Sequence, residues 1–281
     1  MRQMTPYGVS DFVPEETTFF QEKIQILKEL FEQHHYRSVK TPTLEYYDTL
    51  SSAMGDYLKE QAIKFVDRSG HLLILRPDHT TPIARMVATR MAETPRPLRL
   101  CYFDSVFRLK TGELCDAVER FQVGAECIGI SGVQAELETI LLCIRCLEAM
   151  GLTGLSLALG HVSFTKGLSM EEKEALLNKD YTILGALPDR GDATLFSAFP
   201  DLQDLTSQLQ SQLISTQVFV DKSLVHGLYY YTGLIFEVYM KGIALPVAVG
   251  GRYDQLLSKF GADDAAVGFG IDMTLLAEFL Q

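Results

Sequence analysis

Two stretches of the chain carry apolar residues at helical spacing. The first covers residues 14–36, where Pro14 and two acidic residues precede the apolar positions Phe20, Ile24, Leu27, Leu30 and Phe31. The second covers residues 133–152, and its apolar stripe consists of Leu137, Ile140, Leu141, Ile144 and Leu147. Because each spacing gathers the apolar side chains on one face, we predict two amphipathic helices that pack against a core.

Segments with strand-like patterns surround these helices. Leu98, Leu100 and Tyr102 alternate toward one face, and a turn at "KTGE" leads into a return strand over 120–131. Pro42 interrupts a strand over 36–48, which is typical of a sheet edge or a bend. Further strands are predicted at 155–164, 216–223, 227–240 and 245–254. Residues 71–91 are predicted to form a strand, a turn and a helix that begins near Thr80, and a last helix is predicted at 271–280.

The order of these elements decides the fold class. The strands follow one another in antiparallel-looking succession, and helices are inserted between groups of them. This order predicts an α+β fold rather than a regularly alternating βαβ fold. We predict one domain over residues 1–281, with a mostly helical segment at about 166–215.

Composition excludes several classes of function. The chain has 281 residues, of which 47% are hydrophobic and 22% charged, as in a globular protein with a sizeable core. Its net charge of −11 argues against broad electrostatic binding of nucleic acid. The sequence has no run of about 18 apolar residues and no apolar region near Met1. We therefore expect neither a membrane span nor a signal peptide, and a cytoplasmic location.

The sequence contains no complete motif of a metal or nucleotide site. Cys143 and Cys146 have redox or metal spacing, but they flank the apolar stripe of a predicted helix, and no second Cys or His pair completes a zinc site. His34 and His35 end the first helix, where a cation complements the helix dipole. Neither a phosphate-binding glycine loop nor a dinucleotide motif occurs. We expect no metal and no cofactor.

A cluster of phenols indicates a small polar pocket. The stretch "LVHGLYYYTGLIFEVY" places three consecutive tyrosines between Gly227 and Gly233, ahead of an apolar run with Glu237. This stretch and seven others resemble the blocks of histidyl-tRNA synthetases and follow the same order along the chain. The others are "YGVSDFVPEE", "VKTPTLE", "LILRPDHTTPIAR", "VFRLK", "QVGAE", "AVGGRYDQLL" and "AVGFGIDMTLL". The resemblance implies a class II aminoacyl-tRNA synthetase core, a mostly antiparallel sheet flanked by helices. It also implies a homodimer formed around "VKTPTLEYYD".

The resemblance implies a pocket for free histidine. Asp78 stands where the synthetase uses Glu for the α-amino group, Thr80 follows at the matching place, and Arg108 could hold a carboxylate. Gln122 and Glu126 match the residues that face the bound amino acid, and Tyr230, Tyr231 and Tyr253 match the phenols around the imidazole. Each alone has a simpler interpretation: Asp78 could cap a helix, Arg108 could form a structural ion pair, and a strand Tyr is most often a packing residue.

The positions that would handle ATP depart from the family pattern. His226 replaces an arginine that contacts the α-phosphate, and Tyr229 replaces an acid. Lys110 replaces the acid that reads adenine, and Thr274 and Leu275 replace the Glu-Arg pair that ends the third motif. Oriented cations stabilise the charge that develops on a phosphate. Their joint loss predicts that the adenylation chemistry is gone.

An amino-acid pocket without activation groups resembles the regulatory subunit of short-form ATP phosphoribosyltransferase. The chain also stops where the synthetase continues into an anticodon-binding domain, so we expect no tRNA partner. The resemblance implies that the protein activates a short catalytic chain in the first step of histidine biosynthesis, within a hetero-octamer, and carries feedback by histidine. Three alternatives stay open: an active ligase that ATP–pyrophosphate exchange would reveal, a histidine sensor with another client, and a dimerisation scaffold with a relic pocket.

Overall fold

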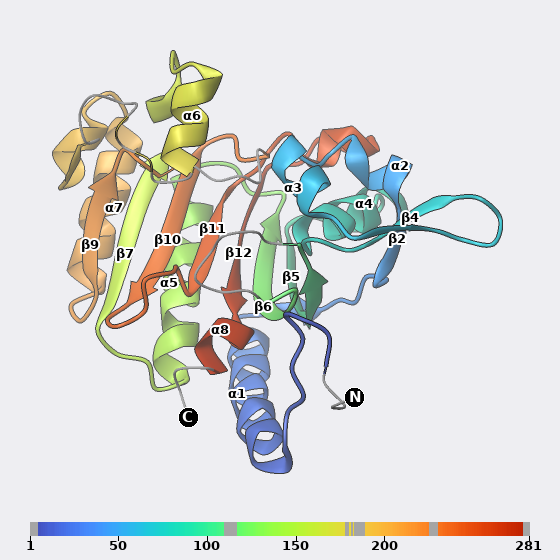
Figure 1. The fold of residues 1–281 in the computed structure, drawn as a ribbon. Coiled ribbons are helices and arrows are strands. Elements are labelled where there is room, and N and C mark those ends of the chain that lie inside the picture. The colour runs from blue at the N-terminus through green and yellow to red at the C-terminus, as the bar shows by residue number, and fades with distance from the viewer. Residues whose placement is uncertain are drawn as a thin grey trace.

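A nine-stranded sheet forms the centre of the protein (Figure 1). The computed structural model describes residues 5–109, 117–177, 180, 182, 189–224 and 230–277. The strands lie in the order β1 (Arg37–Ser38), β5 (Leu98–Phe107), β6 (Glu119–Ile128), β12 (Ala266–Asp272), β11 (Ala248–Arg252), β10 (Leu234–Met240), β7 (Leu155–His161), β9 (Gln217–Asp221) and β8 (Arg190–Gly191). Only β1–β5 and β7–β9 pair in parallel among these strands. The predicted α+β class and mostly antiparallel sheet are confirmed.

Helices cover one face of this sheet and bury most of the core. The helices of the described chain are α1 (Pro14–Gln33), α2 (Tyr47–Ser51), α3 (Asp56–Gln61), α4 (Thr80–Arg90), α5 (Val133–Ala149), α6 (Met170–Leu177), α7 (Pro200–Gln212) and α8 (Met273–Ala277). The apolar stripes of α1, α5 and α7 join the sheet in one large apolar cluster. Cys143 and Cys146 lie in this cluster and are fully buried, which confirms their structural interpretation. No described helix combines the length and the apolar character needed to cross a membrane.

A second, smaller layer lies over the opposite face near β5. Strands β2 (Leu44–Tyr46), β4 (Leu72–Leu75) and β3 (Lys64–Val66) form a three-stranded sheet, and α2, α3 and α4 lie beside it (Figure 1). Three short 3-10 helices complete the described elements: η1 (Val162–Thr165), η2 (Ala193–Phe196) and η3 (Leu257–Phe260). The helix α4 packs beside η3, and together with Leu100 and Ile128 of the large sheet they form a second apolar cluster.

Two segments differ most from the sequence prediction. The segment 36–48 is two short strands in different sheets, because the chain turns away from the large sheet after β1. The strand predicted at 227–240 begins only at Leu234, so Tyr230 and Tyr231 lie in the irregular segment ahead of it. Of the segment 166–215, the described part is α6, β8, η2 and α7, which is mostly helical as predicted. The "KTGE" turn lies outside the described residues.

A buried ion pair fastens the sheet to the helical layer. Arg252 at the end of β11 donates from Nε to Glu136 Oε1 of α5 at 2.8 Å, and both side chains are less than one-tenth exposed. The guanidinium also bonds Gly132 O at 2.9 Å and pairs with Asp254 at 3.0 Å. The pair therefore links β11, the start of α5 and the turn after β11.

We predict that Glu136→Gln lowers the free energy of unfolding by about 3 kcal/mol, because it leaves a buried guanidinium without its buried carboxylate. Urea unfolding followed by circular dichroism measures the change. The control is Glu148→Gln, an exposed acid on the same helix, for which we expect a change within about 0.5 kcal/mol. Equal effects of the two substitutions would contradict the prediction.

Candidate functional site

The first wall of the candidate site is the turn that begins α4. Asp78 Oδ2 accepts hydrogen bonds from the Thr81 backbone N–H at 3.0 Å and from the Thr81 hydroxyl at 2.7 Å. The carboxylate thus caps α4, as the simpler interpretation of this residue held. Its other oxygen, Oδ1, is buried and has no hydrogen-bond partner in the part of the chain that the structure describes. Burial raises the pKa of Asp78. One carboxylate oxygen of Asp78 therefore caps the helix, and the other is available to a ligand.

Glu126 stands opposite this turn on β6, almost fully buried at 1% exposure. Its Oε1 accepts from the Thr80 hydroxyl at 2.8 Å, and its Oε2 accepts from the Tyr253 hydroxyl. Burial raises the pKa of Glu126 to about 8, while these two hydrogen bonds act in the opposite direction. Neutral hydroxyls thus hold this acid in place from two different segments of the chain.

Glycines open the space in which these side chains lie. Gly268 of β12 faces Glu126 across the strand pair, and a Cβ placed there would come within 1.6 Å of Glu126 Oε2. Gly124, two residues before Glu126, likewise leaves room for Tyr102, whose hydroxyl would lie 2.3 Å from an added Cβ. The Tyr102 hydroxyl donates to Phe269 O at 3.4 Å. Tyr102 is a site residue that was missed, although its alternation with Leu100 placed it on this face.

A wall of phenols closes the site. The Tyr230 ring lies 5.0 Å from the Tyr231 ring and 5.8 Å, edge on, from the Tyr253 ring, measured between centroids. Gly251 lets Tyr231 approach, since a Cβ there would lie 2.8 Å from its ring. Burial raises the pKa of each of these phenols above its usual range. They therefore stay neutral at physiological pH and can donate or accept hydrogen bonds.

The two remaining predicted contacts lie at the margin of this cluster. Gln122 shares the face of β6 with Glu126, opposite Asp104 on β5 and Asp272 on β12. Arg108 donates from Nε to Pro77 O at 2.5 Å, next to Asp78, and its charge lowers the pKa of that acid against the effect of burial. The fold therefore brings all eight predicted residues to one part of the sheet face.

The positions that replace ATP-binding groups have structural roles where they are described. Thr274 accepts a hydrogen bond from the Phe121 backbone N–H at 2.8 Å. Leu275 is buried in the core, and its backbone N–H donates to Asp272 Oδ1 at 3.0 Å. Lys110, His226 and Tyr229 lie outside the described residues. At 274 and 275, residues that hydrogen-bond the backbone and pack in the core thus stand where the synthetase family has a Glu-Arg pair.

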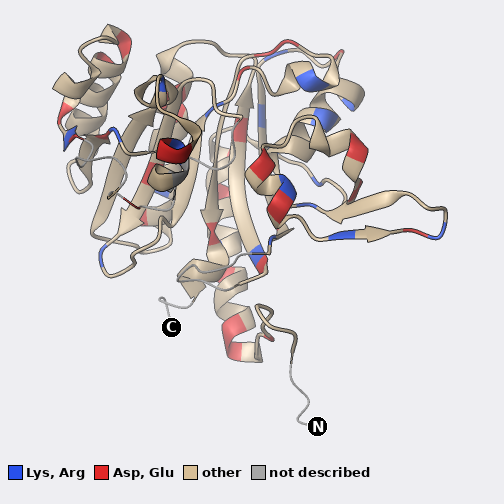
Figure 2. Cartoon of the chain, turned by 45° about the horizontal axis from the view of Figure 1, so that its top comes forward, with Lys and Arg blue, Asp and Glu red and all other residues tan. Residues whose placement is uncertain are grey.

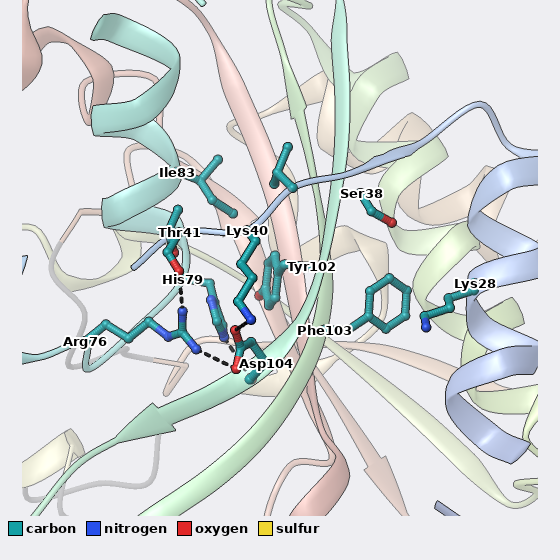
Figure 3. A pocket seen from close by; sticks show the side chains of 11 residues that line it. Lys28, Ser38, Lys40, Thr41, Arg76, His79, Ile83, Tyr102, Phe103 and Asp104 are labelled. Carbon is teal, nitrogen blue, oxygen red and sulfur yellow. Dashed lines mark hydrogen bonds and ion pairs between the residues drawn. The ribbon is translucent and has the colours of Figure 1, made fainter. Parts of the chain in front are cut away.

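A second pocket, of about 310 Å³, lies on the other side of the same turn (Figure 3). Arg76 at its base is buried, pairs with Asp104 at 2.7 Å and donates to Thr41 O at 2.8 Å. His79, between Asp78 and Thr80 in sequence, stacks on Tyr102 at 4.2 Å and donates from Nε2 to Asp104 O. Burial lowers the pKa of His79 to about 4, so it is neutral. None of the eight predicted site residues lines this pocket, but Tyr102 and the turn at 78–80 adjoin both.

Charged positions of both signs are interspersed along the described chain. In Figure 2, the ribbon segments coloured for Lys and Arg lie among those coloured for Asp and Glu rather than in one continuous stripe. Within the described ranges, no group of three or more His, Cys, Asp or Glu is arranged to hold a metal ion. The chemistry that the site offers is recognition of a small ligand by carboxylates and phenols.

Comparison with known proteins places this site in a family. Residues 8–187 and 176–276 match the family model described as histidyl-tRNA synthetase. Among curated proteins, the ATP phosphoribosyltransferase regulatory subunit of Symbiobacterium thermophilum is 34% identical, over 100% of this chain and 81% of the relative. That of Geobacillus thermodenitrificans is also 34% identical, over 97% and 79%. The chain belongs to the ATP phosphoribosyltransferase regulatory subunit family.

Solved structures agree with this membership. A Bacillus halodurans structure described as an ATP phosphoribosyltransferase regulatory subunit/histidyl-tRNA synthetase has a TM-score of 0.85 at 31% identity, covering 100% of this chain and 84% of its own. A histidine–tRNA ligase subunit of Alicyclobacillus acidocaldarius has a TM-score of 0.82 at 25% identity, covering 100% and 99%. The class II synthetase-like fold of the regulatory subunit is confirmed.

We predict that Gly268→Ala displaces Glu126 and lowers the free energy of unfolding by about 1–3 kcal/mol, because the new methyl overlaps a buried carboxylate and the Ala125 carbonyl. Calorimetric titration with histidine should show loss of binding, and urea unfolding gives the stability. Gly191→Ala is the control, because the nearest atom to its added Cβ is 3.4 Å away. A Gly268→Ala subunit as stable and as competent to bind as the control variant would refute this account of the pocket.

Proposed function

We propose that this regulatory subunit of ATP phosphoribosyltransferase, in histidine biosynthesis, binds free histidine between the α4 turn and the phenol wall. The observation that carries the proposal is that two buried acids, Asp78 and Glu126, lie close together, each hydrogen-bonded to a threonine at the start of α4. The unpartnered Oδ1 of Asp78 suits an ammonium group, and Glu126 suits an imidazole N–H. Arg108, at the margin, is the candidate for the carboxylate.

Binding in this pocket becomes regulation only through differential affinity. Histidine lowers the activity of a short catalytic partner chain if it binds a less active arrangement of the complex more tightly. Typical couplings of about 1–3 kcal/mol correspond to changes of roughly 5- to 150-fold. Linkage requires the reverse effect as well: substrates that favour the active arrangement weaken histidine binding by the same factor.

We propose further that the protein forms a homodimer through the edge of the sheet at β1 and the adjoining small sheet. Five large apolar side chains of the small sheet are exposed: Leu44, Tyr46, Phe65, Val66 and Leu72. The strand register places Leu44, Tyr46 and Phe65 on one face of this sheet, and apolar side chains exposed together in this way mark a protein interface. The strand β1 also ends the large sheet and leaves backbone groups of its outer edge unpaired by any described strand.

We predict that Glu126→Ala and Asp78→Ala each weaken feedback by histidine, because they leave the imidazole or the ammonium group without its carboxylate. Activation of the catalytic chain without histidine should stay largely intact, since the pocket wall need not be the docking surface. The measurement is a histidine titration of the reconstituted complex, with half-inhibition shifted by at least about tenfold. Glu93→Ala, an exposed acid beyond α4, serves as the control. Identical inhibition curves for all four subunits would mean that the effector binds elsewhere.

We predict that Tyr46→Glu turns the dimer into a monomer at micromolar concentration, because it places a charge in an apolar contact. Sedimentation equilibrium measures the molar mass. Ile214→Glu alters an apolar side chain that is 93% exposed and far from the small sheet in sequence and fold, so it should leave the dimer unchanged. A wild-type protein that is monomeric under these conditions would exclude the proposed interface.

A further inference from the structure

The proposed histidine pocket contains two buried acids and no cation that forms an ion pair with either of them. Asp78 and Glu126 are 3% and 1% exposed. Their hydrogen bonds come from the backbone and hydroxyl of Thr81 and from the hydroxyls of Thr80 and Tyr253. Neither acid forms an ion pair with a Lys, Arg or His of the described residues. A buried carboxylate is costly to ionise without a cation beside it. A positively charged ligand would supply the cation that the described pocket lacks.

Among the described residues, the titratable groups that face Glu126 are phenols and one further acid. From the large sheet, Tyr102 of β5 and Gly268 of β12 face Glu126, and Tyr253 faces it from the end of β11. Thr80 and Asp78 face it from the start of α4, with Arg108 beyond Asp78. Tyr230 and Tyr231 face it from the segment before β10. The phenols are buried and keep their protons, because burial raises the pKa of each. The two carboxyls are thus the proton-exchanging groups of the described pocket.

We propose that the pocket takes histidine with its side chain as imidazolium, paired with an ionised Glu126, and therefore selects its effector by the basicity of the ring. This inference rests on the proposed function. The proton balance is closed: the Glu126 carboxyl gives its proton to the ring nitrogen that meets it, the O–H bond breaks as the N–H bond forms, and no third group takes part. The pKa of about 8 for Glu126 means that the proton is present in the empty pocket at pH 7.

The inference has a consequence for specificity. An imidazolium donates from both ring nitrogens, one to Glu126 and one to a phenol oxygen of the wall. Hydrogen bonds between ionised partners are roughly twice as strong as neutral ones. A ring of the same size that resists protonation loses this ion pair and should bind about tenfold more weakly or worse.

The test is a cycle of two ligands and two proteins, measured by calorimetry at pH 7. The ligands are histidine and 1,2,4-triazole-3-alanine, which has the same size and the same α-ammonium group but a far less basic ring. The proteins are the wild-type subunit and Glu126→Gln, with folding checked by circular dichroism. We expect histidine to lose at least about tenfold in affinity on Glu126→Gln and the triazole to change by less than about threefold. Equal losses for both ligands would show that the ring is bound neutral and overturn the inference.

A second measurement needs no variant. Histidine labelled with ¹⁵N in the ring is bound to the wild-type subunit at pH 8, where the free ring is neutral. Two similar ring-nitrogen shifts of the imidazolium type are expected for the bound ligand; one pyridine-like nitrogen overturns the inference and leaves the histidine pocket standing. Failure of both ligands to bind the wild-type subunit is a different result, which overturns the proposed pocket and the inference with it.

Discussion

The site depends on the close approach of β12 to Glu126. Where Gly268 meets Glu126 across the β6–β12 pair, no other residue type fits without moving the carboxylate or the backbone beside it. The same absence of side chains at Gly124 and Gly270 admits the Tyr102 hydroxyl. Antiparallel register puts these positions on one face, so a row of glycines across neighbouring strands becomes a hollow floor. Acids and phenols from four other segments then meet above it.

The apolar periodicity was sufficient to predict the helices α1 and α5 and the hairpin of β5 and β6, because each of these elements buries one face against the core. It was insufficient for the tyrosines: "YYY" reads as strand by propensity, yet Tyr230 and Tyr231 precede β10 and turn toward Tyr253. The prediction of one strand over 36–48 was wrong for a similar reason. Packing decides which of the two sheets each part of this segment joins, and apolar periodicity does not record that packing.

The candidate site was predictable only in part. Glu126 and Tyr253 lie 127 positions apart in sequence, and their hydrogen bond follows from the order of strands rather than from any local pattern. The resemblance supplied the residues, and the structure supplies their surroundings: the neutral hydroxyls on Glu126, the free oxygen of Asp78 and the stacking of His79 on Tyr102. A sequence names such residues but does not reveal which of their atoms are already bonded.

The turn at 78–80 has a different neighbour on each side. Asp78 and Thr80 belong to the proposed histidine site, while His79 lines the pocket beside β1 and bonds the Asp104 carbonyl (Figure 3). An ammonium group at Asp78 Oδ1 would bond the same carboxylate whose Oδ2 caps α4. Peptide bonds join residues 78 to 80 directly, so the Asp78 carboxylate and the His79–Tyr102 stack belong to one short turn. Coupling between the pocket and the β1 edge then requires only that the turn has two arrangements which histidine binds unequally.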